Sequence, residues 1–409
     1  MVDLYCTSRL FKSLDILSSL NLKLYNFINI DHFDDTFVRI KRRNKVIKFE
    51  DITHPLFNPK ENSVIILDRR MIERDFKNLM NNFGISFRDK LFDTWKKRNV
   101  KVIFNFAFYE ALEYETDLYD FITYDFPFKH LKLTDYPLFE NKENFLFDRL
   151  YNLLHYFHEN FSGNIDNFPQ QKHTLDKKYL FSSLQMKLRP HRIDFLKKLI
   201  SKNLNEYGYI SGTREYFEEY REDIRKRNFS IDNSFLQNQY FYEDSHKDFF
   251  KKNWEEYADI ISDPMQGDVH QNHTENYNDE LEYDISYIDI QGETHILYNT
   301  MYPIFTEKSY QPIFFEKMFL LYGGNCFYEV LDKLGGHNFK DELLLPDTYF
   351  TTNNPYDQID IIVNSLEQLS KIEFSEVFHE SQDKILENKV LLLEHYNKIM
   401  EPVKQFIES

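Results

Sequence analysis

The chain has 409 residues, 42% of them hydrophobic and 17% aromatic, which is too long for one ordinary domain and apolar enough for two sizeable cores. A formal net charge of -17 disfavours broad binding to nucleic acid or to anionic membranes, although the basic stretch 39–48 leaves a local groove for nucleic acid open. The two cysteines, Cys6 and Cys326, are too few for a disulfide framework and favour a reducing compartment.

Residues 1–165 are predicted to form an α/β domain, because strand-like and helix-like patterns alternate along them. Helical spacing occurs in parts of 71–98, and a helix is expected over 143–160. Short apolar runs predict three strands, at 22–28, 64–68 and 101–106. In parallel sheets ligands bind beyond the carboxyl ends of the strands, so the residues that follow 106 are expected near any cleft.

A polar stretch without periodicity, 161–178, comes next, and we take 166–178 as the linker between two domains. The second α/β domain is expected over 179–380. It opens with a strand at 179–184, which contains Ser182.

This strand leads into a helix expected over 190–204, with Pro190 as its first residue. Arg192 falls in the first turn, where a cation opposes the helix dipole unless an anion is shared between them. That electrostatic penalty predicts a phosphate-binding role for Arg192. The alternative is a surface arginine paired with Asp194 or another nearby acid.

The segment 304–315 places Thr306, Glu307 and Lys308 where a loop enters a helix, between two apolar runs that predict buried strands. A carboxylate such as that of Glu307 accepts hydrogen bonds from sugar hydroxyls, and a lysine beside free backbone N–H groups holds a diphosphate. A capping box with a solvated lysine explains the same residues without any ligand.

Helical patterns continue at 325–335, 357–370 and 374–407, the last as one or two helices. The final helix, 381–409, is expected either to cross back to the first domain or to pack on its own domain. Six apolar residues are expected on its packed side: Leu386, Val390, Leu393, Tyr396, Ile399 and Val403.

Several familiar sites are missing from the sequence. It has no dinucleotide fingerprint, no P-loop, no nucleophile elbow and no Asp-x-Asp motif for a metal-bound nucleotide diphosphate. His270 and His273 are spaced as metal ligands can be, but an acidic solvated loop is the simpler interpretation. No apolar run suits a signal peptide or a transmembrane helix, so we expect a soluble, cytoplasmic protein.

The order of these residues resembles the donor-binding half of the alpha-1,3-fucosyltransferases, over roughly 179–370. It is more similar still to uncharacterised sugar transferases of phages and large algal viruses, which carry an FTEK block followed by an LGF.TF block and an acidic D..YD block. The later two blocks correspond here to residues 334–339 and 347–349. The resemblance is specific at 181–192 and 288–312. Two departures, Thr294-His295 after Glu293 and Gly336 in place of an aromatic residue, leave the donor sugar open.

The resemblance implies a GT-B fold, with two Rossmann-like domains facing across a cleft and the nucleotide sugar held by the C-terminal one. It also implies inverting transfer with no metal and no other cofactor. By the same resemblance, Arg192 and Lys308 bind the donor diphosphate, Glu307 contacts sugar and ribose hydroxyls, and Glu293 is the acidic residue that ends the preceding strand. The expected donor-binding set is completed by Ser182, Arg189 and Thr306.

The acceptor hydroxyl needs a general base from the first domain. Glu110, which follows the strand at 101–106, is the first choice because the family's base lies at the carboxyl end of a strand in its own domain. Glu113 is the second choice. The alternative for Glu110 is an exposed carboxylate at a helix start.

The sequence therefore predicts a glycosyltransferase that moves a sugar from a nucleoside-diphosphate sugar to a hydroxyl of a glycan or glycoconjugate. One alternative is a viral enzyme, working in the host cytoplasm, that glycosylates a modified DNA base. Others are a binding protein that holds a nucleotide sugar without turnover, and a structural protein in which the 306–308 segment is only a helix cap.

Overall fold

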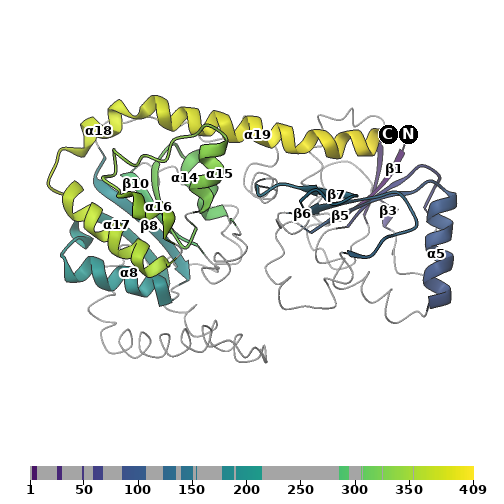
Figure 1. Ribbon diagram of the computed structural model, residues 1–409, viewed down its shortest axis with the longest axis horizontal. Helices are drawn as coiled ribbons and strands as arrows, with labels where there is room; N and C mark the ends of the chain where they lie inside the picture. Colours follow the sequence, from purple (N-terminus) through teal and green to yellow (C-terminus); the bar gives the residue numbers. More distant parts are fainter. Residues whose placement is uncertain are drawn as a thin grey trace. The chain divides into compact units, whose positions relative to one another are not determined.

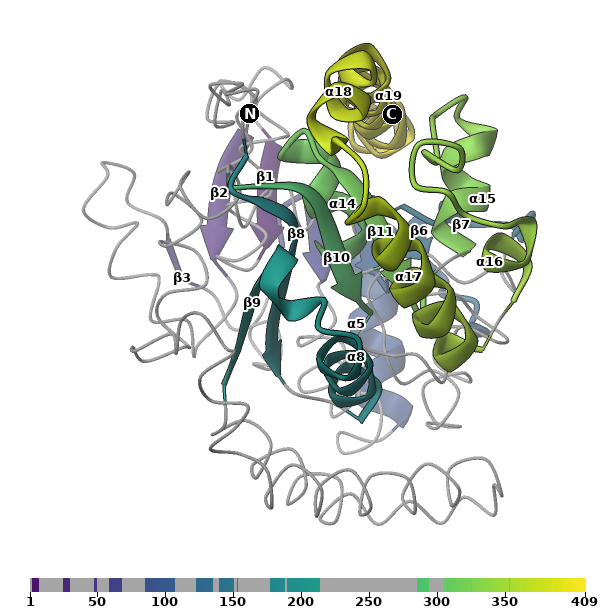
Figure 2. The same ribbon diagram turned by 90° about the vertical axis from the view of Figure 1, so that its left-hand side faces the viewer.

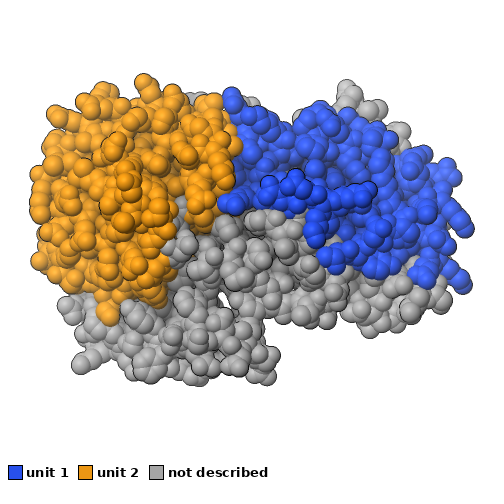
Figure 3. Space-filling view, in the orientation of Figure 1, with its two compact units in different colours: residues 1–168, 393–409 blue, residues 169–392 orange. Residues whose placement is uncertain are grey.

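The computed structural model describes residues 2–6, 25–29, 48–49, 59–67, 85–106, 123–134, 140–150, 153, 177–187, 190–213, 285–293, 305, 307–324, 326–352 and 354–409. The chain divides into two compact units, coloured separately in Figure 3: unit 1 is Met1–Phe168 with Leu393–Ser409, and unit 2 is Pro169–Leu392. Each unit contains a parallel sheet and helices, which confirms the predicted α/β class (Figure 1). Among the described helices, none combines the length and apolarity that a membrane crossing requires.

Unit 1 contains a parallel sheet with the strand order β3-β2-β1-β4-β5-β6-β7. This is the doubly wound order of Rossmann-like folds with one strand added. Before the C-terminal helix α19 (Gln382–Glu408), the described residues of unit 1 contain one helix, α5 (Ile85–Lys97). Its Phe92 and Trp95 pack on Phe126 and Phe128. The strands are β1 (Val2–Cys6), β2 (Tyr25–Asn29), β3 (Lys48–Phe49), β4 (Val64–Leu67), β5 (Lys101–Asn105), β6 (His130–Thr134) and β7 (Phe145–Phe147).

The helix predicted over 143–160 is wrong at its start. Phe145–Phe147 is strand β7, which pairs with β6 in the register Lys132 to Phe145. Asp148 then turns the chain, since its Oδ1 accepts a hydrogen bond of 2.7 Å from the Leu150 backbone N–H. Pairing with β6, the preceding strand, overrides the helical spacing of the apolar residues. Residues 154–160 lie outside the described residues.

The described part of unit 2 has a four-stranded parallel sheet in the order β11-β10-β8-β9. Its strands are β8 (Tyr179–Lys187), β9 (Gly208–Thr213), β10 (Ser286–Gly292) and β11 (Met318–Tyr322). Helix α8 (Pro190–Ser201) and the short 3-10 helix η6 (Asn205–Tyr207) connect β8 to β9, and α14 (Glu307–Phe314) precedes β11. The predicted helix start at Pro190 and the predicted loop-to-helix transition at 306–308, between two buried strands, are both confirmed.

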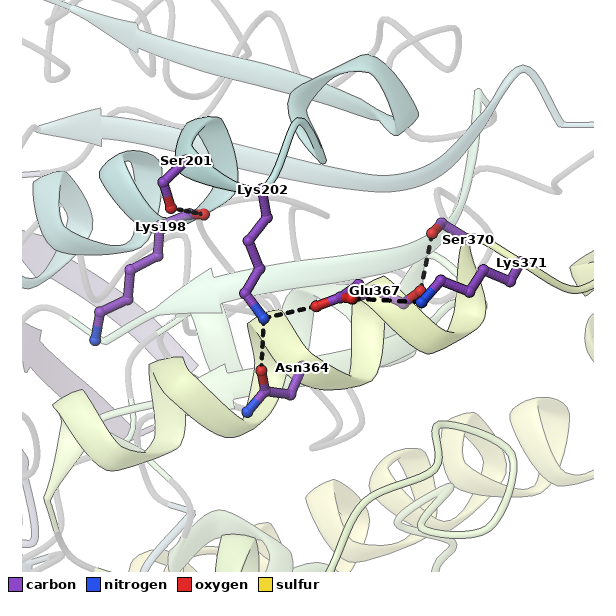
Figure 4. A network of polar contacts seen from close by, with 7 residues as sticks. All are labelled: Lys198, Ser201, Lys202, Asn364, Glu367, Ser370 and Lys371. Carbon is purple, nitrogen blue, oxygen red and sulfur yellow. Dashed lines mark hydrogen bonds and ion pairs between the residues drawn. The ribbon is translucent and has the colours of Figure 1, made fainter.

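The helices that follow β11 are α15 (Cys326–Lys333), α16 (Asp347–Thr351), α17 (Pro355–Leu369), α18 (Phe374–Glu380) and α19 (Gln382–Glu408). Helix α17 packs beside α8 and on β11 (Figure 2). Lys202 fixes the α8–α17 contact, because its Nζ donates at 2.7 Å to Asn364 Oδ1 and lies 2.7 Å from Glu367 Oε2 (Figure 4). This exposed ion pair orients the two helices and adds little free energy.

Side chains complete the outer edge of β11, which lies at the end of the described sheet. The Tyr349 hydroxyl donates to Leu321 O at 2.7 Å and accepts from Leu321 N at 2.9 Å. Two residues further on, the Gly323 N–H donates to Gln358 Oε1 at 2.7 Å. These contacts satisfy backbone groups that an edge strand otherwise leaves open, and burial raises the pKa of Tyr349 so that its hydroxyl stays protonated.

Replacing Tyr349 with phenylalanine is expected to destabilise unit 2 by about 2 kcal/mol, because the buried Leu321 carbonyl loses the hydroxyl that donates to it and the Leu321 N–H keeps only the 3.3 Å bond to the Tyr328 hydroxyl. Denaturant unfolding of the variant measures this cost. Tyr207→Phe, which removes the hydroxyl of a side chain that is 43% exposed, is the matched control and should change the free energy of unfolding by less than about 0.5 kcal/mol. Equal losses in the two variants would contradict the edge-capping role.

A buried polar network lies inside the sheet of unit 2. The Asp289 carboxylate accepts from Gln291 Nε2 at 2.9 and 3.0 Å and from Ser182 Oγ at 3.5 Å, and the Ser286 hydroxyl donates to Ser182 Oγ at 2.9 Å. Lys317 donates to the Ser286 carbonyl. Burial raises the pKa of Asp289 to about 6, against the lowering effect of Gln291 and Lys317.

This pKa makes stability depend on pH. The unfolded pKa of Asp289 is about 4. Between this value and the folded pKa, the folded state binds more protons than the unfolded state does. The contribution of Asp289 to stability therefore falls as pH rises through this window. We expect the free-energy difference between wild type and Asp289→Asn to change by about 2 kcal/mol from pH 4 to pH 7, in favour of the variant at the higher pH. Denaturant unfolding at several pH values measures it, and a constant difference would show that Asp289 does not titrate in this range.

Helix α19 contributes to both units. In unit 2, Asn388 exchanges hydrogen bonds of 2.7 and 2.9 Å with the His337 backbone. In unit 1, His395 Nε2 lies 3.0 Å from Asp148 Oδ2, and Lys101 Nζ donates at 3.0 Å to Ile407 O. The C-terminal half of α19 thus contacts Lys101 in β5 and Asp148, which follows β7.

The buried side of α19 differs in part from the predicted one. Leu386 and Val390 are exposed, at 40% and 52%, whereas the prediction placed them on the packed side. Tyr396, Ile399 and Val403 are buried as predicted. The buried apolar residues are Ile385, Leu392, Tyr396, Ile399, Val403 and Ile407.

Candidate functional site

The described sheet of unit 2 reverses its strand order between β8 and β10. The chain runs from β8 outward to β9 on one side, whereas β10 and then β11 lie on the other side. In open α/β sheets ligands bind beyond the carboxyl ends of the strands at such a switch point. Helices α8, α14 and α15 begin at this edge, and the first turns of α8 and α14 carry the predicted phosphate-binding residues.

The end of β10 holds both first turns. From α8, Arg192 Nη2 donates to Gly292 O at 2.6 Å and His191 Nε2 donates to Glu293 O at 3.0 Å. From α14, the Ser309 hydroxyl donates to Glu293 Oε1 at 2.5 Å. We call Gly292 and Glu293, with these three partners, the β10 junction.

Two glycines allow this close packing. A Cβ on Gly292 would lie 2.5 Å from the Tyr322 ring, and a Cβ on Gly324 would lie 2.7 Å from Glu293 Cγ. Gly323, between Tyr322 and Gly324, has φ of 78°, which favours glycine. The loop after β11 is therefore shaped to the Glu293 side chain.

The predicted phosphate-binding residues occupy different environments. Arg192 is only 2% exposed, so it is not the surface arginine of the alternative interpretation, and Asp194 instead pairs with Lys198 at 3.0 Å. Lys308 is half-buried in the first turn of α14. Glu307 is the first residue of α14, and its side chain is not among those that the structure describes.

The other predicted residues are more widely placed. Glu293 directly follows β10, as expected, and is 1% exposed. Ser182 lies in the middle of β8, within the Asp289 network and fully buried. Four predicted residues lie outside the described part of the chain: Glu110, Glu113, Arg189 and Thr306.

Sequence reasoning missed three members of the site. His191 and Ser309 are neighbours of the predicted Arg192 and Lys308, and their roles depend on contacts to β10 that sequence spacing does not show. Gly324 follows a buried strand in a Gly-Gly pair, which is a signal for close backbone approach.

Metal ligation finds no support in the described residues, which contain no group of three or more His, Cys, Asp or Glu side chains arranged to hold an ion. His270 and His273 lie outside them. The absence of a metal requirement stays a prediction.

No protein-family model matches the chain. No curated protein matches it in sequence either, so the predicted relation to phage and algal-virus sugar transferases has no support from these comparisons. Among solved structures, the chain is similar to a crystal structure of an alpha1,3-fucosyltransferase, with 11% sequence identity, 96% of this chain and 91% of that chain covered, and a TM-score of 0.34. A TM-score this low does not establish a common fold, so this similarity assigns no activity to the chain.

Proposed function

We propose that the protein is an inverting, metal-independent glycosyltransferase that uses a nucleoside-diphosphate sugar and delivers the sugar to a hydroxyl of a glycan or glycoconjugate. One observation carries the proposal: the first turns of α8 and α14, 100 or more residues apart in the chain, both bind Gly292 or Glu293 at the end of β10, at the switch point of a parallel sheet. The two sequence blocks that resemble the fucosyltransferase donor site therefore meet in space.

The chemistry of the reaction suits this edge of the sheet. Transfer breaks the bond between the sugar and the diphosphate, and negative charge develops on the departing nucleoside diphosphate. Lys308 and the backbone N–H groups in the first turn of α14 supply positive charge there without a metal ion. Glu307 binds sugar or ribose hydroxyls in this proposal.

Arg192 is the second cation of the proposed phosphate site. Its Nη2 group donates to Gly292 O at 2.6 Å, at the end of β10. Because the side chain is 2% exposed, a phosphate would reach it only after neighbouring side chains move. We therefore expect donor binding to be accompanied by a rearrangement around the first turn of α8.

The proposal assigns proton removal from the acceptor hydroxyl to Glu110, with Glu113 as the second candidate. The base takes the proton while the acceptor oxygen attacks the anomeric carbon, and the diphosphate leaves with the bonding electrons. The cysteine content favours a reducing compartment, and we place the protein in the cytoplasm.

The test is nucleotide binding followed by turnover. Thermal shift and calorimetry with GDP, UDP and their sugar conjugates should show binding to the wild-type protein, since a ligand that binds the native state raises its stability. Incubation with a glycan acceptor library should then release free nucleoside diphosphate. Binding without any release indicates a non-catalytic nucleotide-sugar-binding protein, and no binding of any nucleotide refutes the proposal.

A further inference from the structure

We infer that Glu293 is a positioning residue that sets the first turn of α14 for diphosphate binding, and that it does so through Ser309 rather than by contacting the donor. This inference rests on the proposed function and concerns the same site. The family resemblance implies that Glu293 belongs to the donor-binding set. The inference gives it an indirect role, through α14, instead.

The first step is the burial of the carboxylate. Glu293 is 1% exposed and Ser309 is 0% exposed, and a hydrogen bond of 2.5 Å joins them. A hydroxyl that donates to a buried carboxylate makes a stronger bond than a neutral pair does. The bond therefore fixes where the first turn of α14 begins relative to the end of β10.

The second step is the support behind the carboxylate. The Glu293 carbonyl accepts from His191, and its Cγ lies against Gly324, where a Cβ would be only 2.7 Å away. The His191 ring in turn packs edge-on against Tyr322, with ring centroids 5.8 Å apart. Glu293 is thus fixed by a hydrogen bond from α8 and by packing against the loop after β11. Its carboxylate in turn bonds Ser309 of α14.

The third step is the consequence for the ligand. Lys308 directly precedes Ser309 in the first turn of α14, and the backbone N–H groups of a first helical turn point toward an anion bound at the helix start. Their direction depends on the placement of the turn, and small displacements of binding groups cost much of the binding energy. Loss of the Ser309–Glu293 bond should therefore weaken diphosphate binding although neither residue touches the diphosphate.

Four variants test the inference: Ser309→Ala, Glu293→Ala, Glu293→Gln and the double Ser309→Ala/Glu293→Ala. Ser201→Ala is the matched control, because the Ser201 hydroxyl bonds only the Lys198 carbonyl in its own helix and is exposed. The measured quantities are Kd for GDP and UDP by calorimetry, KM and kcat for transfer, and thermal unfolding.

Positioning predicts that Ser309→Ala and Glu293→Ala each raise Kd and the donor KM by about 10-fold, and that the double variant adds little more. Glu293→Gln should stay within about twofold of wild type, since its amide oxygen still accepts from Ser309. A purely structural role would lower the unfolding temperature and leave the Kd of the folded protein unchanged.

Other results would overturn the inference. If Glu293→Gln loses as much affinity as Glu293→Ala while Ser309→Ala matches Ser201→Ala, the carboxylate itself contacts the donor. Should Ser309→Ala fail to fold, Glu293→Gln decides alone, because wild-type affinity is expected and a 10-fold loss contradicts positioning. If wild-type protein binds neither nucleotide, the proposed function fails first and this inference fails with it.

Discussion

Replacement of Lys308 with alanine is expected to lower kcat/KM for sugar transfer by about 100-fold or more, with most of the loss in kcat. Lys308 is in the first turn of α14, which begins at the carboxyl edge of the sheet, where the diphosphate departs in the proposed reaction. Its attraction grows as charge develops on the leaving group, so the transition state loses more than the bound donor does. Steady-state kinetics with the donor identified by calorimetry measures the effect.

Two further variants isolate the charge. Lys333→Ala removes one exposed cation from the end of α15 and should leave kcat/KM within about twofold of wild type. Lys308→Arg keeps the charge but changes the shape of the donor group, and partial activity is expected. Equal kinetics for Lys308→Ala and Lys333→Ala would show that α14 does not hold the diphosphate.

Truncation after Leu392 is expected to leave unit 1 without stable structure while unit 2 stays folded. The truncation removes the segment Leu393–Ser409, which belongs to unit 1. Tyr396, Ile399, Val403 and Ile407 are each 5% exposed or less, and loss of four such side chains costs about 8 kcal/mol, comparable to the whole stability of a domain. Hydrogen exchange should show fast exchange throughout unit 1 and protection in β10 and β11.

Point variants show whether the side chains of α19, rather than the mere length of the chain, stabilise unit 1. Ile399→Ala should destabilise unit 1 by about 3 kcal/mol, because it leaves a cavity beneath the helix. Asn397→Ala, on the exposed side of the same turns, should cost less than about 0.5 kcal/mol. If unit 1 of the truncated chain keeps its protection, Leu393–Ser409 contributes no core to it.

Sequence patterns predicted the elements whose signals are local. Runs of apolar residues identified β4, β5, β8 and β11, and Pro190 marked the start of α8. Strand β7 was missed because its formation depends on pairing with β6 rather than on its own three residues. On α19, leucines and isoleucine stand side by side at 385–386 and 391–393, so the sequence offers two apolar stripes and only the packed partners select between them.

For the candidate site, residue types were predictable and their partners were not. The acid at the end of β10 and the cations in two helix starts were expected from local sequence. That Glu293 binds Ser309, and that Arg192 binds Gly292 O, depends on how two loops bring α8 and α14 to one strand end. Such contacts span 16 and 100 positions, and no short motif encodes them.

The division of α19 between the units sets the order in which the protein can fold during translation. Multidomain chains usually complete their N-terminal domain first as they emerge from the ribosome. Here unit 1 is complete only after Leu393–Ser409 has been synthesised. Every residue of unit 2, Pro169–Leu392, has been synthesised before that segment. The nascent first half therefore spends most of synthesis with the surface for Tyr396, Ile399 and Val403 uncovered, which makes it a natural client for chaperones that shield apolar surface.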